Sequence, residues 1–147
     1  MFIIVQTRMS STRLLKKVLG EINGKPLLEY LVARLIGIIE SDICIATSGH
    51  SENDEIEDFC REIDIPCFRG SRDNIAKRML DAAKHYNKDV FVQINVDSPL
   101  IDYKIIDQAI RIFQNGEYDL VTNTFLRSFP AGQSVEVIQK NFYESRG

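Results

Sequence analysis

A group of cations and hydroxyls directly follows the first apolar segment of this chain. Residues 2–5 (Phe-Ile-Ile-Val) are typical of a buried strand, and the next segment carries Thr7, Arg8, Ser10, Ser11, Thr12, Arg13, Lys16 and Lys17. Cations combined with hydroxyl and amide donors are what a polyphosphate requires. Loops at the carboxyl ends of parallel strands are also where open α/β sheets bind ligands. The alternative is a solvated basic loop beside an ordinary strand.

This basic segment is not one of the glycine-rich phosphate loops. The sequence contains neither the Walker pattern nor a Gly-x-Gly-x-x-Gly fingerprint at this place. If the segment holds phosphates, it therefore does so with side chains and a few backbone amides.

A second polar group lies in the apolar segment 90–96. Alternation places Gln93, Asn95 and Asp97 on one strand face, where polar groups are costly unless they meet partners. A carboxylate at the end of a strand, held by the nearby Pro99, is a good Mg²⁺ ligand. The alternative is that Asp97 caps the next turn through its own backbone.

Three further positions are weaker candidates. The small residues of 46–50 around Thr47 leave room for a ring, although a simple loop before a helix fits equally well. Ser71 offers a hydroxyl to a ligand or caps a helix. Glu136 points away from the side chains of its two valine neighbours, toward the edge expected for Asp97, unless it is a solvated carboxylate on an edge strand.

The elements that must position these residues alternate between strands and helices. Apolar patterns predict strands at 2–6, 43–46, 66–69, 90–96, 119–122 and 135–138, with helices opened by Gly24-Lys25-Pro26, by Ser51 or Asp54, by Ser71, and by Asp102 or Tyr103. This alternation implies βαβ units and a mostly parallel sheet in one domain spanning 1–147. A last helix begins near Lys140, soon before the sequence stops, which leaves open a naturally short protein or a piece of a longer one.

Composition narrows the class of partner. The net charge of −3 disfavours binding to bulk nucleic acid, so the local positive charge fits a small anionic ligand better. No apolar stretch is long enough to span a bilayer and no signal peptide is recognisable, which predicts a cytoplasmic protein. We expect the three cysteines to be reduced and mostly in the core, and a zinc site is disfavoured because the two histidines lie far apart.

Taken together and in order, these segments resemble the cytidylyltransferase family that makes CMP-activated sugar acids, above all its spore-coat-polysaccharide branch. The likeness covers nearly the whole chain. Its motifs are Thr7-Arg8-Met9, Ser11-Thr12-Arg13-Leu14, Lys17-Val18-Leu19, Gly24-Lys25-Pro26-Leu27, Ala46-Thr47, Arg69-Gly70-Ser71 with Arg78, Asp97 with Pro99-Leu100-Ile101-Asp102, and Val135-Glu136-Val137.

The resemblance implies a three-layer α/β/α nucleotide-diphospho-sugar transferase fold and transfer of CMP from CTP to a sugar, with release of pyrophosphate. It implies that Arg8, Arg13 and Lys17 hold the triphosphate and that Asp97 ligates Mg²⁺, with Glu136 facing the metal or the sugar. The nucleotide would also meet side chains at Thr7, Ser11, Thr47, Ser71 and Asn95.

Several positions depart from the family pattern. Ser10 and Val96 replace glycines, Leu15-Lys16 replaces Pro-Gly, and the neutral Ala131 and Ser134 stand where the family has aspartates. Nucleotide binding tolerates these changes better than catalysis does, so a non-catalytic nucleotide-binding subunit stays open. A glycosyltransferase using a nucleotide-sugar donor ranks lower, because Asp97 lacks a second aspartate two residues on. The apolar late segment (Val135, Val137, Ile138, Phe142) suggests pairing into a homodimer.

Overall fold

Six strands form one sheet in the computed structural model, which describes residues 1–7, 17–37 and 41–145. The strand order is β5-β4-β1-β6-β8-β7. The strands are β1 (Phe2–Gln6), β4 (Asp42–Ser48), β5 (Cys67–Gly70), β6 (Val90–Asn95), β7 (Leu120–Thr122) and β8 (Glu136–Gln139). Strands β5, β4, β1 and β6 run parallel, whereas β8 is antiparallel to both β6 and β7. The prediction of a mostly parallel sheet is therefore confirmed.

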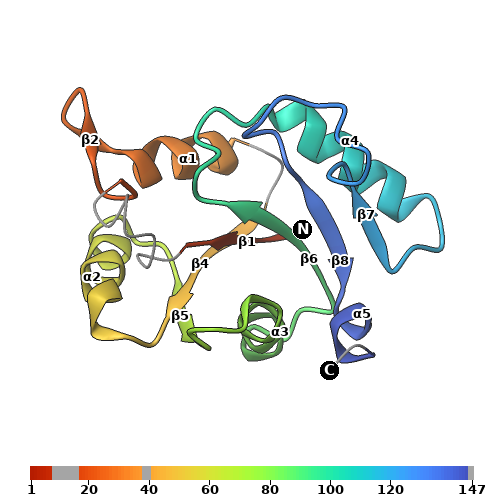
Figure 1. Cartoon of the computed structure of the whole chain (residues 1–147), viewed down its shortest axis with the longest axis horizontal. Coiled ribbons are helices and arrows are strands. Elements are labelled where there is room, and N and C mark those ends of the chain that lie inside the picture. The colour runs from red at the N-terminus through yellow and green to blue at the C-terminus, as the bar shows by residue number, and fades with distance from the viewer. Residues whose placement is uncertain (8–16, 38–40, 146–147) are drawn as a thin grey trace.

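Helices cover both faces of this sheet. Figure 1 shows α1 (Leu27–Ile36) and α4 (Tyr103–Gln114) on one side, with α3 (Ile75–His85) and α5 (Lys140–Glu144) on the other. Helix α2 (Asp54–Glu62) packs its buried residues into the same cluster as α1 and α4. The three-layer α/β/α architecture is thus the one that the resemblance implied.

The alternation of side chains along β1 divides the core into two clusters. Ile3 and Val5 pack beneath α1, α2 and α4, whereas Phe2 and Ile4 pack toward α3 and α5. All four side chains are buried, because a central parallel strand is covered by helices on both faces. This burial explains why the strand appears in the sequence as a continuous apolar run.

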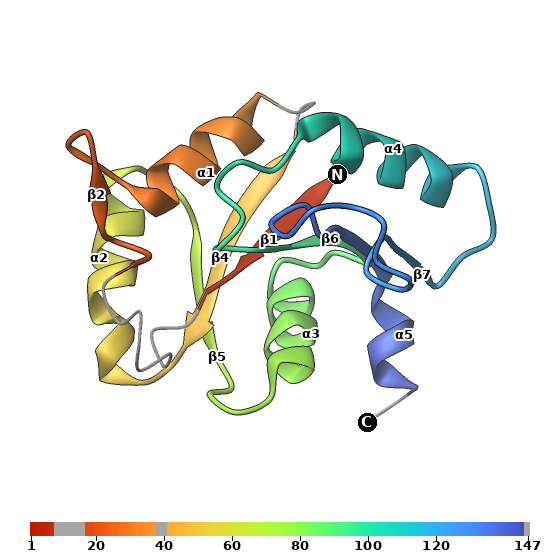
Figure 2. The ribbon, with the colours of Figure 1, turned by 45° about the horizontal axis from the view of Figure 1, so that its top comes forward.

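A short hairpin replaces the predicted start of the first helix. Glu21–Ile22 (β2) pairs with Lys25–Pro26 (β3) across Asn23 and Gly24, whose φ angles are 52° and 76°. Two consecutive positive φ angles are what a tight two-residue hairpin needs, and an Asn-Gly pair supplies them. The helix expected after Gly24-Lys25-Pro26 is present, but it begins at Leu27 with Pro26 as its N-cap, and Lys25–Pro26 belongs to the hairpin (Figure 2).

One further helix begins later than predicted, and another has a different N-cap. Helix α3 starts at Ile75, where the Asn74 side chain accepts a hydrogen bond from the Lys77 amide at 2.8 Å, so Ser71 does not cap it. Helix α2 follows a short 3-10 turn (Ser51–Asn53), and its N-cap is Asn53 rather than Ser51 or Asp54. Asp102 does cap α4, as expected.

The apolar late segment is used inside the fold. Val135, Val137 and Ile138 are all buried in the core. These three side chains therefore offer no surface to a second copy, whereas Phe142 is only partly buried, and pairing into a homodimer stays a prediction. Among the described residues, no helix has the length and apolar character needed to cross a membrane.

Candidate active site

Four parallel strands bring their carboxyl ends to one edge of the sheet. Gln6 pairs with Ala46 on one side and with Asn95 on the other. The Thr7 amide donates to the Ala46 carbonyl at 3.0 Å, and the Val96 amide donates to the Gln6 carbonyl at 3.0 Å. The segments that follow β1, β4 and β6 are therefore neighbours, as ligand loops in an open α/β sheet must be.

Two buried threonine hydroxyls lie at this edge. Thr7 is 1% exposed and Thr47 is 0% exposed, and neither Oγ1 atom has a hydrogen-bond partner among the described residues. They extend the faces of Val5 and Ile45, which pack in one cluster. Buried hydroxyls nearly always find a partner, so this pair marks a place where a polar group of a ligand can be received.

The loop after β4 is held by a buried side-chain network that the sequence analysis missed. Asn53 Nδ2 donates to Ser48 Oγ at 2.7 Å, and both side chains are buried. The His50 amide donates to the same Ser48 Oγ at 3.4 Å. An asparagine just before a helix has the pattern of an ordinary cap, so the sequence held no signal for this second role.

Arg69 does not belong to the phosphate-binding group. Its Nη1 lies 2.6 Å from Asp54 Oδ1 and 2.7 Å from Glu57 Oε2, and its Nη2 donates to the His50 carbonyl at 2.7 Å. These carboxylates, Glu57 first, raise the pKa of the guanidinium. Arg69 thus ties α2 and the loop after β4 to β5.

The turn after β5 uses both Ser71 and Arg78. The Gly49 amide donates to the Gly70 carbonyl at 3.0 Å, which places this turn beside the loop after β4. Ser71 Oγ accepts from the Asn74 amide at 3.2 Å, while the buried Arg78 donates from Nη1 to the Ser71 carbonyl at 2.7 Å. Ser71 therefore reaches the same edge, but its hydroxyl already serves the turn.

Asn95 and Asp97 are both exposed at the end of β6. The turn there is closed by backbone, since the Ser98 amide donates to the Asn95 carbonyl at 3.1 Å. The Asp97 carboxylate accepts no hydrogen bond from the part of the chain that the structure describes, so the turn cap considered as the alternative is absent there. No described residue therefore competes with a cation for its oxygens.

Glu136 lies at a different level of the sheet from Asp97. It is opposite Gln93 in the β6–β8 register, and Gln93 Nε2 donates to its Oε2 at 3.2 Å. Tyr143 in turn donates its hydroxyl to Gln93 Oε1 at 3.1 Å. Burial raises the pKa of Glu136, and a hydrogen bond with Thr122 opposes that shift.

Asp97 and Glu136 lie at different levels of the sheet, since Glu136 is opposite Gln93 and Asp97 follows the end of β6. No group of three or more His, Cys, Asp or Glu side chains among the described residues is arranged to hold a metal ion. The joint assignment of Asp97 and Glu136 to one ion stays a prediction, and of the two, Asp97 is the carboxylate placed at the ligand edge.

Residues 131–134, which carry the neutral Ala131 and Ser134, reach the same edge through Gln133. Gln133 Nε2 donates to the Leu100 carbonyl at 3.1 Å, and the Asp102 amide donates to Gln133 Oε1 at 2.8 Å. These bonds fix residues 131–134 beside the loop that follows Asp97. Ala131 and Ser134 therefore stand close to that loop without supplying a carboxylate.

Lys17 is exposed, and its segment is anchored to the beginning of α1. The Gly20 amide donates to the Lys17 carbonyl at 3.1 Å, and the Leu28 amide donates to the Val18 carbonyl at 3.0 Å. The other basic candidates, Arg8 and Arg13, lie outside the described residues, as does Ser11.

Comparisons with known proteins agree with this arrangement. The chain is 30% identical over 145 residues to the spore coat polysaccharide biosynthesis protein SpsF of Bacillus subtilis, covering 94% of this chain and 58% of that protein. It is 29% identical over 118 residues to the 3-deoxy-manno-octulosonate cytidylyltransferase of Chlorobium phaeobacteroides, covering 78% and 46% respectively. The chain thus spans about half the length of these curated relatives.

A solved structure and a family model extend the match. The structure of a cytidylyltransferase from Leptospira borgpetersenii superposes with a TM-score of 0.91 at 32% identity, covering 97% of this chain and 61% of that one. The family model described as cytidylyltransferase matches residues 2–142. Because that match spans nearly the whole sequence, the chain belongs to the cytidylyltransferase family.

Proposed function

We propose that this domain binds CTP and transfers CMP to a sugar acid, with release of pyrophosphate, in the synthesis of a surface polysaccharide. The observation that carries the proposal is the carboxyl edge of the sheet. There, the neighbouring ends of β1, β4 and β6 carry the buried Thr7 and Thr47, whose hydroxyls have no described partner, and the exposed Asn95 and Asp97. Membership of the family supports the use of CTP. The names of the two curated relatives suggest the sugar-acid substrate and the polysaccharide pathway.

The nucleotide would lie across the loops after β1, β4 and β6. Thr7 and Thr47 would offer their hydroxyls to the cytidine, and the exposed amide of Asn95 would meet the edge of the base. The Ser48–Asn53 bond keeps the loop beside Thr47 in one conformation, which lowers the entropy lost when a ring is bound. Ser11 and Ser71 would complete the polar lining.

The triphosphate would be held by Arg8, Arg13 and Lys17. In transfer, an oxygen of the sugar attacks the α-phosphorus while the bond to the β-phosphate breaks, and negative charge builds up on the departing pyrophosphate. Fixed cations beside that group stabilise the transition state more than the ground state. These three residues would therefore act on rate as well as on binding.

The residues at this edge fit a magnesium ion. Mg²⁺ is held by one or two carboxylates together with substrate phosphates and water, rather than by a cage made of protein. The Asp97 carboxylate, which accepts no hydrogen bond from a described residue, meets this requirement, and Glu136 is the candidate second carboxylate. When bound, the ion would polarise the phosphoryl group and neutralise part of its charge.

A non-catalytic role is the second candidate, favoured by one observation. Gln133 fixes the segment 131–134 beside the loop after Asp97, where Ala131 and Ser134 are neutral. A site that lacks those carboxylates could bind CTP without turnover. The three free cysteines are in keeping with a cytoplasmic protein under either function.

The test is pyrophosphate release from CTP and Mg²⁺ with a panel of sugar acids and neutral sugars. Release that requires one of the sugar acids and falls at least tenfold in Asp97→Asn supports the transferase. Binding of CTP without release in any mixture supports the non-catalytic role. Hydrolysis of a nucleotide-sugar, with no reaction of CTP, would instead support a glycosyltransferase.

A further inference from the structure

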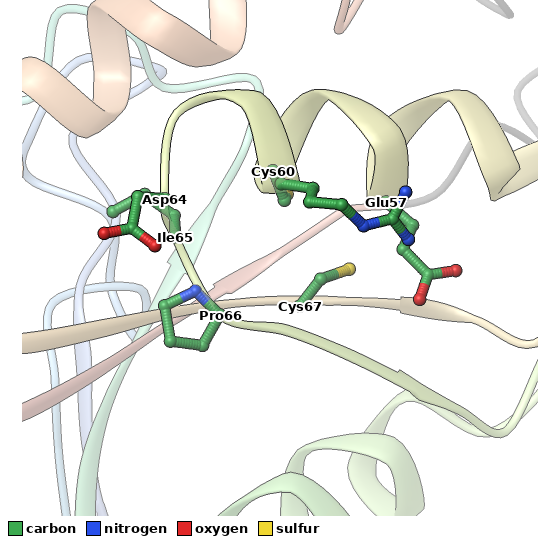
Figure 3. A pocket seen from close by; sticks show the side chains of 7 residues that line it. Glu57, Cys60, Asp64, Ile65, Pro66 and Cys67 are labelled. Atoms are coloured by element: carbon green, nitrogen blue, oxygen red, sulfur yellow. The ribbon is translucent and has the colours of Figure 1, made fainter.

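Two cysteines meet across the connection between α2 and β5. Cys60 lies near the end of α2 and Cys67 is the first residue of β5. The connection folds back tightly, because the Ile65 amide donates to the Cys60 carbonyl at 2.9 Å. Both side chains line one open pocket of about 370 Å³, and Figure 3 shows Cys60 on the helix above Cys67 on the strand.

The two thiols differ in their access to solvent. Cys60 is 1% exposed and belongs to the main core cluster, whereas Cys67 is only partly buried at the pocket. A small reagent that enters the pocket therefore meets Cys67 first. Cys60 lies behind it, able to attack whatever forms on the Cys67 sulfur.

The interaction between the two thiols shifts their pKa values in opposite directions. The interaction with Cys60, followed by the charge of Arg69, lowers the pKa of Cys67 against the opposing effects of burial and of Glu57. The interaction with Cys67, together with deeper burial, raises the pKa of Cys60. The thiolate is the reactive form of cysteine, so the accessible thiol is also the more nucleophilic one.

We propose that Cys60 and Cys67 form a reversible modification site, at which a hydroperoxide converts the pair into an intramolecular disulfide. The Cys67 thiolate attacks the peroxide oxygen, the O–O bond breaks, and Cys67 becomes a sulfenic acid while hydroxide or alkoxide leaves. Cys60 then attacks the Cys67 sulfur, loses its proton and displaces water. Two thiols are oxidised by two electrons in total, the peroxide is reduced, and a dithiol reductant restores the pair.

The third cysteine provides a matched control. Cys44 lies on the opposite face of the sheet, in the cluster beneath α3, and burial raises its pKa to about 12. Its neighbours Ile43 and Ile45 point to the face on which Cys60 lies. Cys44 is therefore not part of the proposed modification site.

The first experiment uses the full chain treated with hydrogen peroxide, then denatured and alkylated with iodoacetamide. We expect one of the three thiols to remain alkylatable, a mass loss of two hydrogens, and one cross-linked peptide joining Cys60 to Cys67. The Cys44→Ser variant should give the same cross-link with no thiol left. Addition of oxygen atoms without a cross-link, a bridge to Cys44, or three alkylatable thiols would overturn the proposal.

The second experiment separates the roles of the two cysteines. In Cys60→Ser, peroxide should leave a sulfenic acid on Cys67 that dimedone labels, whereas Cys67→Ser should give no dimedone label on Cys60. Dimedone labelling of Cys60 in Cys67→Ser at the rate seen for Cys67 would contradict the assigned order of attack. Should either variant fail to fold, the peptide map of the wild-type chain decides the proposal alone, because it requires no nucleotide activity.

Discussion

Arg78 lies so close to Gly70 that a Cβ placed on the glycine would stand 3.0 Å from Arg78 Cγ. The same Cβ would stand 2.8 Å from Phe68 Cε1, inside the contact distance that carbon atoms tolerate. The buried Arg78 reaches past the glycine to the Ser71 carbonyl and so fixes the turn after β5. A glycine between the strand and the turn is therefore a packing requirement of this edge of the sheet.

We expect Gly70→Ala to destabilise the protein, because either Phe68 or Arg78 must move to admit the methyl group. The expected loss of unfolding free energy is about 1–3 kcal/mol, as for other overpacked sites. Urea unfolding measures this free energy. Gly37→Ala is the control, because a Cβ at Gly37 would lie 3.8 Å from its nearest neighbour, an ordinary van der Waals distance. Equal stability of the two variants would contradict the close packing.

Loss of the Ser48–Asn53 hydrogen bond should lower both the unfolding free energy of the protein and its affinity for CTP. We expect Asn53→Ala to lower the unfolding free energy by about 1–3 kcal/mol, because the buried Ser48 hydroxyl loses its strongest donor. CTP binding should weaken as well, since the loop beside Thr47 would no longer be fixed. The control is Gln114→Ala, which removes an exposed amide from α4. If Asn53→Ala bound CTP as tightly as the wild type, the loop would have no part in the site.

For Asp97 we expect a different result: its removal should weaken ligand binding and leave the stability of the fold unchanged. Its carboxylate is exposed and makes no hydrogen bond to a described residue, so Asp97→Ala should change the unfolding free energy by no more than about 0.5 kcal/mol. The increase in CTP affinity on adding Mg²⁺ should disappear. Asp119→Asn, another exposed acid, should retain it. A Mg²⁺ effect that survives in Asp97→Ala would assign the ion to other ligands.

Removal of the Lys17 side chain should change the affinities for CTP and CMP by different amounts. If its ammonium group faces the β- and γ-phosphates, Lys17→Ala should weaken CTP binding more than CMP binding, when both are measured by calorimetry. The control is Lys88→Ala, because Lys88 pairs with Asp42 at 3.0 Å, at the amino end of β4 and on the opposite edge of the sheet. Equal losses for CMP and CTP in Lys17→Ala would place this lysine away from the terminal phosphates.

The buried Glu136 carboxyl should make the unfolding free energy of the protein depend on pH. Burial raises its pKa above the ordinary value of 4.5, so ionisation costs more in the folded than in the unfolded state. The stabilising effect of the neutral form is complete below that ordinary value and is lost as pH rises through the folded-state pKa. Glu136→Gln does not titrate, so its unfolding free energy relative to wild type should be higher at pH 7 than at pH 4. A difference that does not change with pH would show an unperturbed carboxylate.

The sequence predicted the parts of the fold that arise from burial. The continuous apolar run of β1 and the helical spacing of Leu28, Leu31 and Leu35 in α1 both reflect central positions in the layers, and all are buried. Turn chemistry was harder to recognise. The pair Asn23-Gly24 is a hairpin signal, but the proline two residues later suggested a helix start instead.

The sequence predicted those site residues whose position follows from the parallel order of the strands alone. Thr7, Thr47, Asn95 and Asp97 lie at or just after the carboxyl ends of their strands, so the parallel topology brings them to one edge. Glu136 was expected at that edge because its face was correct, but the antiparallel register of β8 sets it opposite Gln93. The Cys60–Cys67 contact depends on how tightly the connection between α2 and β5 turns, which periodicity does not reveal.

Whether this domain binds CTP can be measured by titrating the purified full chain with CTP, UTP, ATP and GTP, each with and without Mg²⁺, and following the binding by calorimetry and by thermal unfolding. A CTP concentration of about 100 times its Kd would add about 2.7 kcal/mol to the unfolding free energy. We expect saturable binding that is selective for CTP and strengthened by Mg²⁺. Equal binding of all four nucleotides, or no binding of CTP with Mg²⁺ present, would contradict it.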